Sequence, residues 1–268
     1  MNPGPSRARR TCHASLPFRA GGLREGAFTL IELLVVMSII AILLVLMAPA
    51  FTTLKSAGDV TSAAYTIKGV LDQARTYAMA NNTYTWVGFY EENVSTPSTN
   101  PPTPGIGRLV MSIVASKEGT IIYDPSNPAK ILTTKLIQVG KLVKIENVHL
   151  ATFNNGLGTG STFATRPAVT YRIGDGTTPP NSLTPFQYPV GNPEPAVQYT
   201  FVKAVQFSPT GEARIDNSTS SYPLQNAAEI GMVPTHSTTL ANANLNLVPN
   251  RVAIQFTGVG GDVKIYRQ

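Results

Sequence analysis

The stretch GAFTLIELLVVMSIIAILLVLMAPA, residues 26–50, decides how this chain is built, because it is apolar along almost its whole length. No residue from Leu33 to Phe51 carries a charge, and Glu32 is the one carboxylate in the run. As an α-helix with a rise of about 1.5 Å per residue, residues 28–51 span roughly 36 Å, which is enough to cross a bilayer. The sequence therefore predicts a membrane-crossing helix that keeps an acid near its start.

Charge is distributed unevenly along the chain of 268 residues. Residues 1–27 hold five arginines and one glutamate, whereas the rest carries 16 Lys and Arg against 14 Asp and Glu. The net charge of +6 therefore comes mainly from this basic leader and does not indicate a nucleic-acid footprint on the body. Arginines before the apolar run predict a cytoplasmic leader and a body across the membrane. The single cysteine, Cys12, is also in the leader, so intrachain disulfides and cysteine-based metal sites are excluded.

Glu32 separates three interpretations of the apolar run. Ala48-Pro49-Ala50 has the small residues of a signal peptidase site, so the run can be the core of a secretory signal peptide. It can also be a plain membrane anchor. Neither interpretation uses Glu32, whose carboxylate costs about 2–3 kcal/mol in hydrocarbon unless a positive group lies near it. In the third interpretation a peptidase cuts just before Phe28, and the new α-amino group of one chain neutralises Glu32 of the next chain in a helical array.

The basic leader, FTLIELL and the apolar run together resemble the N-terminal processing motif of type IV pilins and type II secretion pseudopilins. The resemblance implies that a membrane prepilin peptidase removes the leader and methylates the new N-terminus at Phe28. Gly26 and Ala27 are then the processing residues. The family usually has Gly directly before Phe; a cut after Ala27 keeps Glu32 as the fifth mature residue, and a cut after Gly26 makes it the sixth. Pro49 fits the same frame, because pilin-like helices often carry a proline there that permits a kink.

The helical pattern continues through residues 52–82 with an apolar stripe at alternating spacings of four and three. Its members are Val60, Ala64, Ile67, Leu71, Ala74 and Ala78. We expect this stripe to pack on a sheet and the helix to end at Asn81-Asn82.

After the helix the apolar period changes to two. The candidate strands are residues 84–90, 108–115, 120–123, 130–139, 142–150, 168–173, 197–208, 213–216, 251–257 and 262–266. The turn-rich stretches 93–107 and 176–195 are expected to be exposed loops. The sequence predicts an α+β, pilin-like fold, in which a long N-terminal helix packs on a mostly antiparallel sheet. Its parts are a leader (1–27), an assembly helix (28–51), an amphipathic helix (52–82) and a β-rich periplasmic domain (83–268).

Three further segments resemble the GspH/FimT-type minor pseudopilins, although much less specifically than the N-terminal motif. QARTYAMANNTYTWVGF resembles their helix end and first strand, and KAVQFSPTGEARI and VAIQFTGVGGDVKIYRQ resemble their two closing hairpins. Some members of the family bind DNA through a basic C-terminal tail. Here Asp262 stands where the first arginine is expected, so Lys264 and Arg267 favour a half-exposed strand, and nucleic-acid binding is not the expectation.

Motifs of catalysis are missing from the sequence. His149 and His236 have no other metal-ligating residue near them at the spacing of a zinc motif. The segment GLGTGST at 156–162 lacks the Gly-Lys-Ser/Thr ending of a phosphate loop, and residues 124–127 lack an EF-hand pattern. We expect no enzyme activity, no metal and no cofactor.

The sequence instead predicts a structural subunit of a type II secretion pseudopilus or a type IV pilus. It would cross the bacterial inner membrane once, with its N-terminus in the cytoplasm. Its partners would be the prepilin peptidase, other pilin or pseudopilin subunits, the inner-membrane assembly platform and membrane lipid. A pilus-tip subunit that binds DNA or surfaces, and a secreted ligand-binding or enzymatic domain, are the alternatives.

Overall fold

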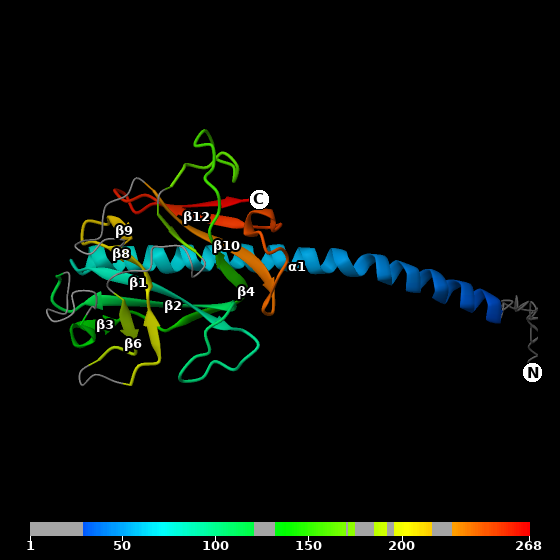
Figure 1. Cartoon of the computed structure of the whole chain (residues 1–268), viewed down its shortest axis with the longest axis horizontal. Helices are drawn as coiled ribbons and strands as arrows, with labels where there is room; N and C mark the ends of the chain where they lie inside the picture. The colour runs from blue at the N-terminus through cyan, green and yellow to red at the C-terminus, as the bar shows by residue number, and fades with distance from the viewer. Residues whose placement is uncertain (1–28, 121–131, 170, 175–184, 192–195, 216–226) are drawn as a thin grey trace, which may run out of the picture. The chain divides into compact units, whose positions relative to one another are not determined.

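The computed structural model describes residues 29–120, 132–169, 171–174, 185–191, 196–215 and 227–268; the side chains of residues 46, 48–56 and 133 lie outside this description (Figure 1). The chain divides into two units, Met1–Ala48 and Pro49–Gln268. One helix, α1 (Leu30–Ala80), contributes to both.

Within the described residues, the second unit combines α1 with thirteen strands, so the predicted α+β class is confirmed. The strands are β1 (Thr85–Asn93), β2 (Gly107–Ser116), β3 (Leu136–Gln138), β4 (Val143–Ala151), β5 (Tyr171–Ile173), β6 (Phe186–Tyr188), β7 (Tyr199–Phe201), β8 (Lys203–Phe207), β9 (Ala213–Ile215), β10 (Ala228–His236), β11 (Thr239–Leu240), β12 (Val252–Phe256) and β13 (Val263–Arg267). Two 3-10 turns, η1 (Thr133–Lys135) and η2 (Leu245–Leu247), lie between strands.

Eleven strands form one sheet with the order β13-β12-β10-β4-β2-β1-β8-β9, and β3, β5 and β11 pair beside this path. Its pairs are antiparallel except for β5, which runs parallel to β10. A bulge at Asn147 lets β4 leave β2 and continue along β10: Gly107 is opposite Val148, but Arg108 is opposite Glu146. Asn147 has a φ of 62°, which asparagine tolerates better than most residues, and its Nδ2 donates to Asp59 Oδ2 on α1 at 3.3 Å.

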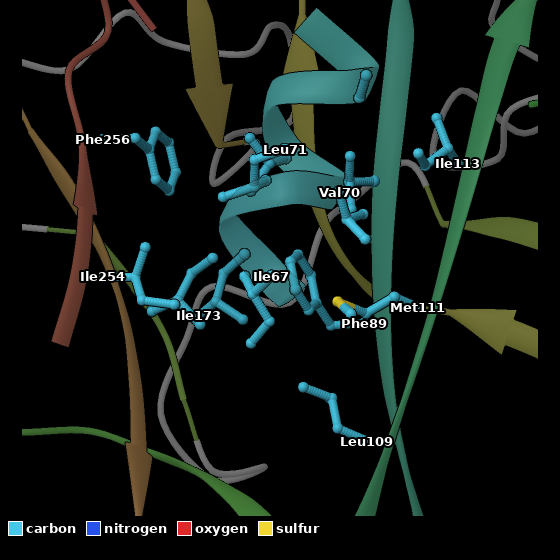
Figure 2. Packing of buried hydrophobic residues seen from close by; sticks show 14 of the residues in the cluster. Ile67, Val70, Leu71, Phe89, Leu109, Met111, Ile113, Ile173, Ile254 and Phe256 are labelled. Atoms are coloured by element: carbon cyan, nitrogen blue, oxygen red, sulfur yellow. The ribbon is translucent and has the colours of Figure 1, made fainter. Parts of the chain in front are cut away.

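The main core lies between α1 and the concave face of this sheet. All six residues of the predicted apolar stripe are buried, so that prediction is confirmed, and Ala63 and Val70 join them. Figure 2 shows Ile67 and Leu71 of α1 facing Ile254 and Phe256 of β12, with Phe89 and Met111 on the other side of the helix. The sheet therefore curves around the helix and contacts it from two sides.

The two edges of the curved sheet meet at α1. The β8–β9 turn and the β12–β13 turn are joined by a hydrogen bond from Ala213 N to Gly258 O (2.8 Å). Gly211 and Gly261, with φ values of 87° and 65°, bring these turns against Arg75. A Cβ on Gly261 would lie 2.9 Å from Arg75 Nε, so the missing side chain permits this close approach.

The outer face of the sheet is covered in part by a hairpin of β6 and β7. Phe186 and Phe201 stack at 5.0 Å between ring centroids and pack with Trp86 of β1. A Cβ on Gly88 would lie 2.5 Å from Phe201 Cβ and 2.6 Å from Phe186 Cζ, so glycine is needed beneath the hairpin. The expectation that 176–195 is an exposed loop is wrong at this point, because Phe186 is fully buried.

Several strands differ from the sequence-based assignment. β10 and β11 were not predicted, and residues 197–208 divide into β7 and β8 around exposed Val202. The stretch 130–139 contains η1 and only a short β3. Of the candidate strand 120–123, Thr120 lies in a bend and the rest falls outside the described residues.

Candidate functional site

The start of α1 is a capping box built from Thr29 and Glu32. Thr29 Oγ1 accepts a hydrogen bond from Glu32 N (3.2 Å), and Glu32 Oε2 accepts from both Thr29 N and Thr29 Oγ1 (3.5 Å each). Leu33 N donates to Thr29 O at 3.1 Å, which places Thr29 at the N-cap. The pattern Thr-x-x-Glu satisfies backbone donors at the helix start that have no partner within the helix.

Sequence reasoning assigned Glu32 to an intermolecular contact and missed its local partner. The signal was present, since a threonine three residues before a glutamate at the start of an apolar helix is the sequence pattern of a capping box. Both side chains are exposed in the single chain, so the carboxylate is also accessible to a neighbouring molecule.

The following residues of α1 expose apolar side chains on all sides. Every described side chain from Leu30 to Met47 is exposed; Leu30, Val45 and Leu44 are exposed by 81%, 74% and 63%. A water-facing helix of a globular protein has one apolar stripe, whereas a helix that is apolar all round is surrounded by lipid or by other helices. Residues 30–47 therefore have the surface of a helix that packs against lipid or against other helices.

Within the part of the chain that the structure describes, no helix offers an apolar stretch long enough to cross a membrane. The processing residues Gly26, Ala27 and Phe28 lie outside the described residues. Pro49 lies within the backbone span of α1, and its side chain is outside the description.

A buried network centred on Glu92 fixes the loop of residues 94–106 to the globular unit. Ser98 Oγ donates to both oxygens of Glu92 (2.8 Å each), Tyr199 Oη donates to Oε1, and Arg108 Nη1 contacts Oε2 at 3.2 Å. Arg108 also donates to the carbonyls of Thr96 and Val94 (3.1 and 3.2 Å). We call the set Glu92, Ser98, Arg108, Lys144 and Tyr199 the Glu92 network.

The Glu92 network keeps its carboxylate ionised. Burial alone raises the pKa of Glu92, but hydrogen bonds from Tyr199, Ser98 and Arg108 and the charge of Lys144 lower it below its usual 4.5. Burial alone would lower the pKa of Arg108, yet the hydrogen bonds and charges of Glu92 and Glu146 raise it. Lys144 Nζ also donates to Tyr199 Oη at 2.8 Å. These groups are engaged with one another and together hold the loop of residues 94–106 on the sheet.

A second buried network fixes the long segment between β4 and β5. Arg166 binds Glu229 of β10 through two nitrogens and also donates to the carbonyls of Phe163 and Asn154 (2.7 Å each). The guanidinium lies over the ring of Phe163 at 4.3 Å, and Gln255 Nε2 donates to Glu229 Oε2 at 2.9 Å. Arg166 therefore connects the segment to β10, and Gln255 of β12 joins the same carboxylate and also donates to Pro167 O at 2.9 Å.

The other residues singled out in the sequence lie apart from these two networks or outside the described residues. His149 Nδ1 lies 2.8 Å from Glu91 Oε1, and His236 ends β10 and is exposed. In the GLGTGST segment, amides of Leu157, Gly158 and Gly160 donate to backbone carbonyls of residues 164–166, so they are already used within a turn. The candidate calcium loop 124–127 lies outside the described residues. Lys264 and Arg267 are both exposed on β13, and Lys264 Nζ lies 5.0 Å from the ring centroid of Tyr266.

Comparison with known proteins bears on the N-terminal segment. A family model described as the prokaryotic N-terminal methylation motif matches residues 23–48. The match indicates a precursor of the pilin or pseudopilin type, which a prepilin peptidase processes and which assembles with other pilin subunits. No curated protein and no solved structure matches the chain.

Proposed function

We propose that this chain is a minor pseudopilin or a related pilin-like subunit, which is inserted into a short periplasmic filament of a type II secretion or type IV pilus machine. The observation that carries the proposal is the exposure of apolar side chains around α1 from Leu30 to Met47, within the matched motif. Such a surface requires lipid before assembly and neighbouring helices after it. Residues 28–51 would cross the bacterial inner membrane, with residues 1–27 in the cytoplasm.

The GspH/FimT type is our preferred assignment within this class. Its support is the pair of closing hairpins, β8–β9 and β12–β13, whose turns meet at Arg75 of α1. The two hairpins and the helix end that contains Arg75 are the three segments in which the sequence resembles that family. We propose that the β-rich unit recognises partners and has no catalytic activity, in agreement with the structural roles of Glu92 and Glu229.

The mature N-terminus provides the test. The processed protein is isolated from the membranes of the producing bacterium and analysed by intact and fragment mass spectrometry. We expect a chain that begins with N-methylated Phe28; a chain that begins at Ala27 would move the cut by one bond and retain the class. A chain that begins at Phe51 would show signal peptidase cleavage and overturn the proposal. A strain without prepilin peptidase is the control, and it should retain the leader.

A further inference from the structure

The long segment between β4 and β5 contains the one Asn-Gly step of the sequence, Asn155-Gly156. Both residues lie in irregular structure, where Asn155 is exposed to solvent and Gly156 is half-buried. An asparagine followed by glycine is chemically reactive, because glycine has no side chain to hinder attack by its amide nitrogen on the asparagine carboxamide. Whether the reaction proceeds in a folded chain depends on how the fold holds these two groups.

The carboxamide of Asn155 is held by its oxygen. Oδ1 accepts a hydrogen bond from Val169 N at 3.0 Å and another from Arg172 Nη2. Both donors draw electron density away from Cγ, and they face the oxygen on which negative charge develops when a nucleophile adds to Cγ. A guanidinium is always protonated in proteins, so this stabilisation is permanent. The fold thus prepares the carbon of the carboxamide for attack.

The amide nitrogen of Gly156 is the nucleophile, and within the described part of the chain it donates no hydrogen bond. The amides of the next two residues, Leu157 and Gly158, donate to Ala164 O and Arg166 O at 3.0 Å each. A Cβ on Gly156 would lie 2.3 Å from Arg166 O, so the packing of this turn requires glycine. The residue that the turn requires is therefore also the one that leaves the nucleophile unhindered.

The surroundings hold more positive than negative charge. Arg166 Nε lies 2.7 Å from Glu229 Oε2, whereas Arg172 Nε is 3.9 Å from Oε1 of the same carboxylate and has no hydrogen-bond partner. Arg251 donates to main-chain carbonyls, and burial and the charge of Arg166 lower its pKa. Among the described residues, Glu229 is the one carboxylate that pairs with these three arginines. A second carboxylate beside Arg172 would therefore be stabilised.

We propose that Asn155 converts itself to aspartate through a cyclic imide formed with Gly156. Gly156 N gives its proton to solvent and forms a bond to Asn155 Cγ. The Cγ–Nδ2 bond then breaks, and the side-chain nitrogen takes up a proton and leaves as ammonia. One water molecule opens the imide and gives an aspartyl or an isoaspartyl residue, without oxidation or reduction. In the aspartyl product the new carboxylate replaces the carboxamide as the acceptor for Val169 N and Arg172.

Mass spectrometry of the full chain over time tests the conversion. The purified protein is kept in detergent at neutral pH and digested at intervals, and fragment spectra locate the exchange of amide for acid. Asn154 is the internal control, because it is exposed in the same segment but is followed by asparagine. We expect conversion at Asn155 to be at least about tenfold faster than at Asn154. Equal rates, or no conversion at Asn155, overturn the proposal.

Arg172→Met tests the positioning role of Arg172. We expect conversion of Asn155 to slow at least about threefold, less than the roughly 10²–10³ for a buried oxyanion-hole donor, because this site is exposed. Arg172→Lys keeps a charged donor and should restore part of the rate. Denaturant unfolding of both variants checks that they are folded. An unchanged or faster rate in Arg172→Met overturns the role given to Arg172.

Asn155→Asp tests whether the fold accepts the product. The variant should unfold at a denaturant concentration equal to or above that of the parent, because Arg172 gains a carboxylate partner. In the Arg172→Met background the same substitution should bring no gain. A midpoint of Asn155→Asp below that of the parent would overturn the product geometry. The mass spectra decide separately whether the reaction occurs.

Discussion

Arg166 binds both carboxylate oxygens of Glu229, with Nε 2.7 Å from Oε2 and Nη2 3.2 Å from Oε1, and the two side chains are only 2% and 1% exposed. The ion pair is thus removed from water and connects a loop residue to a central strand. A buried pair of this kind need not exceed a well-packed apolar pair in stability, but the loss of one partner leaves the other charge buried alone.

We therefore expect Arg166→Met to lower the free energy of unfolding toward the lower end of about 3–5 kcal/mol, because buried Glu229 loses its two-nitrogen partner and retains only the longer contact to Arg172 Nε at 3.9 Å. The measurement is denaturant unfolding of the purified chain in detergent, followed by circular dichroism. Glu118→Gln is the matched control: Glu118 pairs with Lys135 at 3.0 Å on the surface, with half-exposed side chains, and should cost at most about 1 kcal/mol. Equal losses in both variants would contradict the role given to burial.

Glu92 predicts a specific dependence of stability on pH. Its pKa in the folded chain lies below the usual 4.5, so the folded state favours the ionised form. The stabilisation is fully present above the unfolded pKa and is lost as the pH falls through the folded pKa. The difference in unfolding free energy between the parent and Glu92→Gln should therefore be greatest near neutral pH and shrink steadily below about pH 4.5. A difference that stays constant down to pH 3 would argue against this account.

Gly88 should be among the least replaceable residues of the sheet. An added Cβ overlaps both phenylalanines of the β6–β7 hairpin, so Gly88→Ala should destabilise the unit by about 1–3 kcal/mol through overpacking. Trp86, the single tryptophan, packs in the same cluster, and its fluorescence reports the local change. Gly58→Ala is the comparison, because a Cβ there meets nothing within 4 Å and alanine favours the helix. The prediction fails if both variants unfold at the parent's denaturant midpoint with unchanged Trp86 emission.

The two roles of Glu32 can be separated by substitution. Glu32→Gln keeps a side chain that can complete a capping box but removes the charge, whereas Thr29→Ala keeps the charge and weakens the cap by about 1 kcal/mol. If the charge pairs with a neighbour's amine, Glu32→Gln and Glu32→Ala should both be cleaved and methylated yet fail to enter filaments. Thr29→Ser, which preserves the cap, is the control. Incorporation of Glu32→Gln at the parent level would remove the pairing argument and leave the cap as the role of Glu32.

The helix and its buried face were predictable from the sequence, because Val60 to Ala78 follow one helical period without interruption. The central strand β10 was not, since Gly231 and Pro234 usually mark breaks. The structure explains both: a Cβ on Gly231 would overlap Ala151 O of β4, and Pro234 lies beyond the last residue that β12 pairs with, Met232. These reasons depend on contacts across the fold, which a local pattern does not contain.

The residues of the candidate site also divide into those that the sequence could predict and those that it could not. Glu32 was recognisable because an acid inside an apolar run is rare, and its cap to Thr29 is a local pattern that sequence reasoning can find. The partners of Glu92 and Glu229 were not recognisable, because Tyr199 and Arg166 are far from them along the chain. They are brought near by the β6–β7 hairpin and by the segment between β4 and β5, respectively.

The hydrogen bond from Ala213 to Gly258 also sets an order of events during synthesis. The hairpin of β12 and β13 follows all of the other described strands along the chain, so the sheet cannot close over α1 until that hairpin has emerged. Until then the apolar stripe of α1 is only partly covered, and contacts between distant segments form slowly. A newly synthesised molecule thus passes through a stage in which its own helix is accessible to other chains, and enclosure of the helix marks the end of folding.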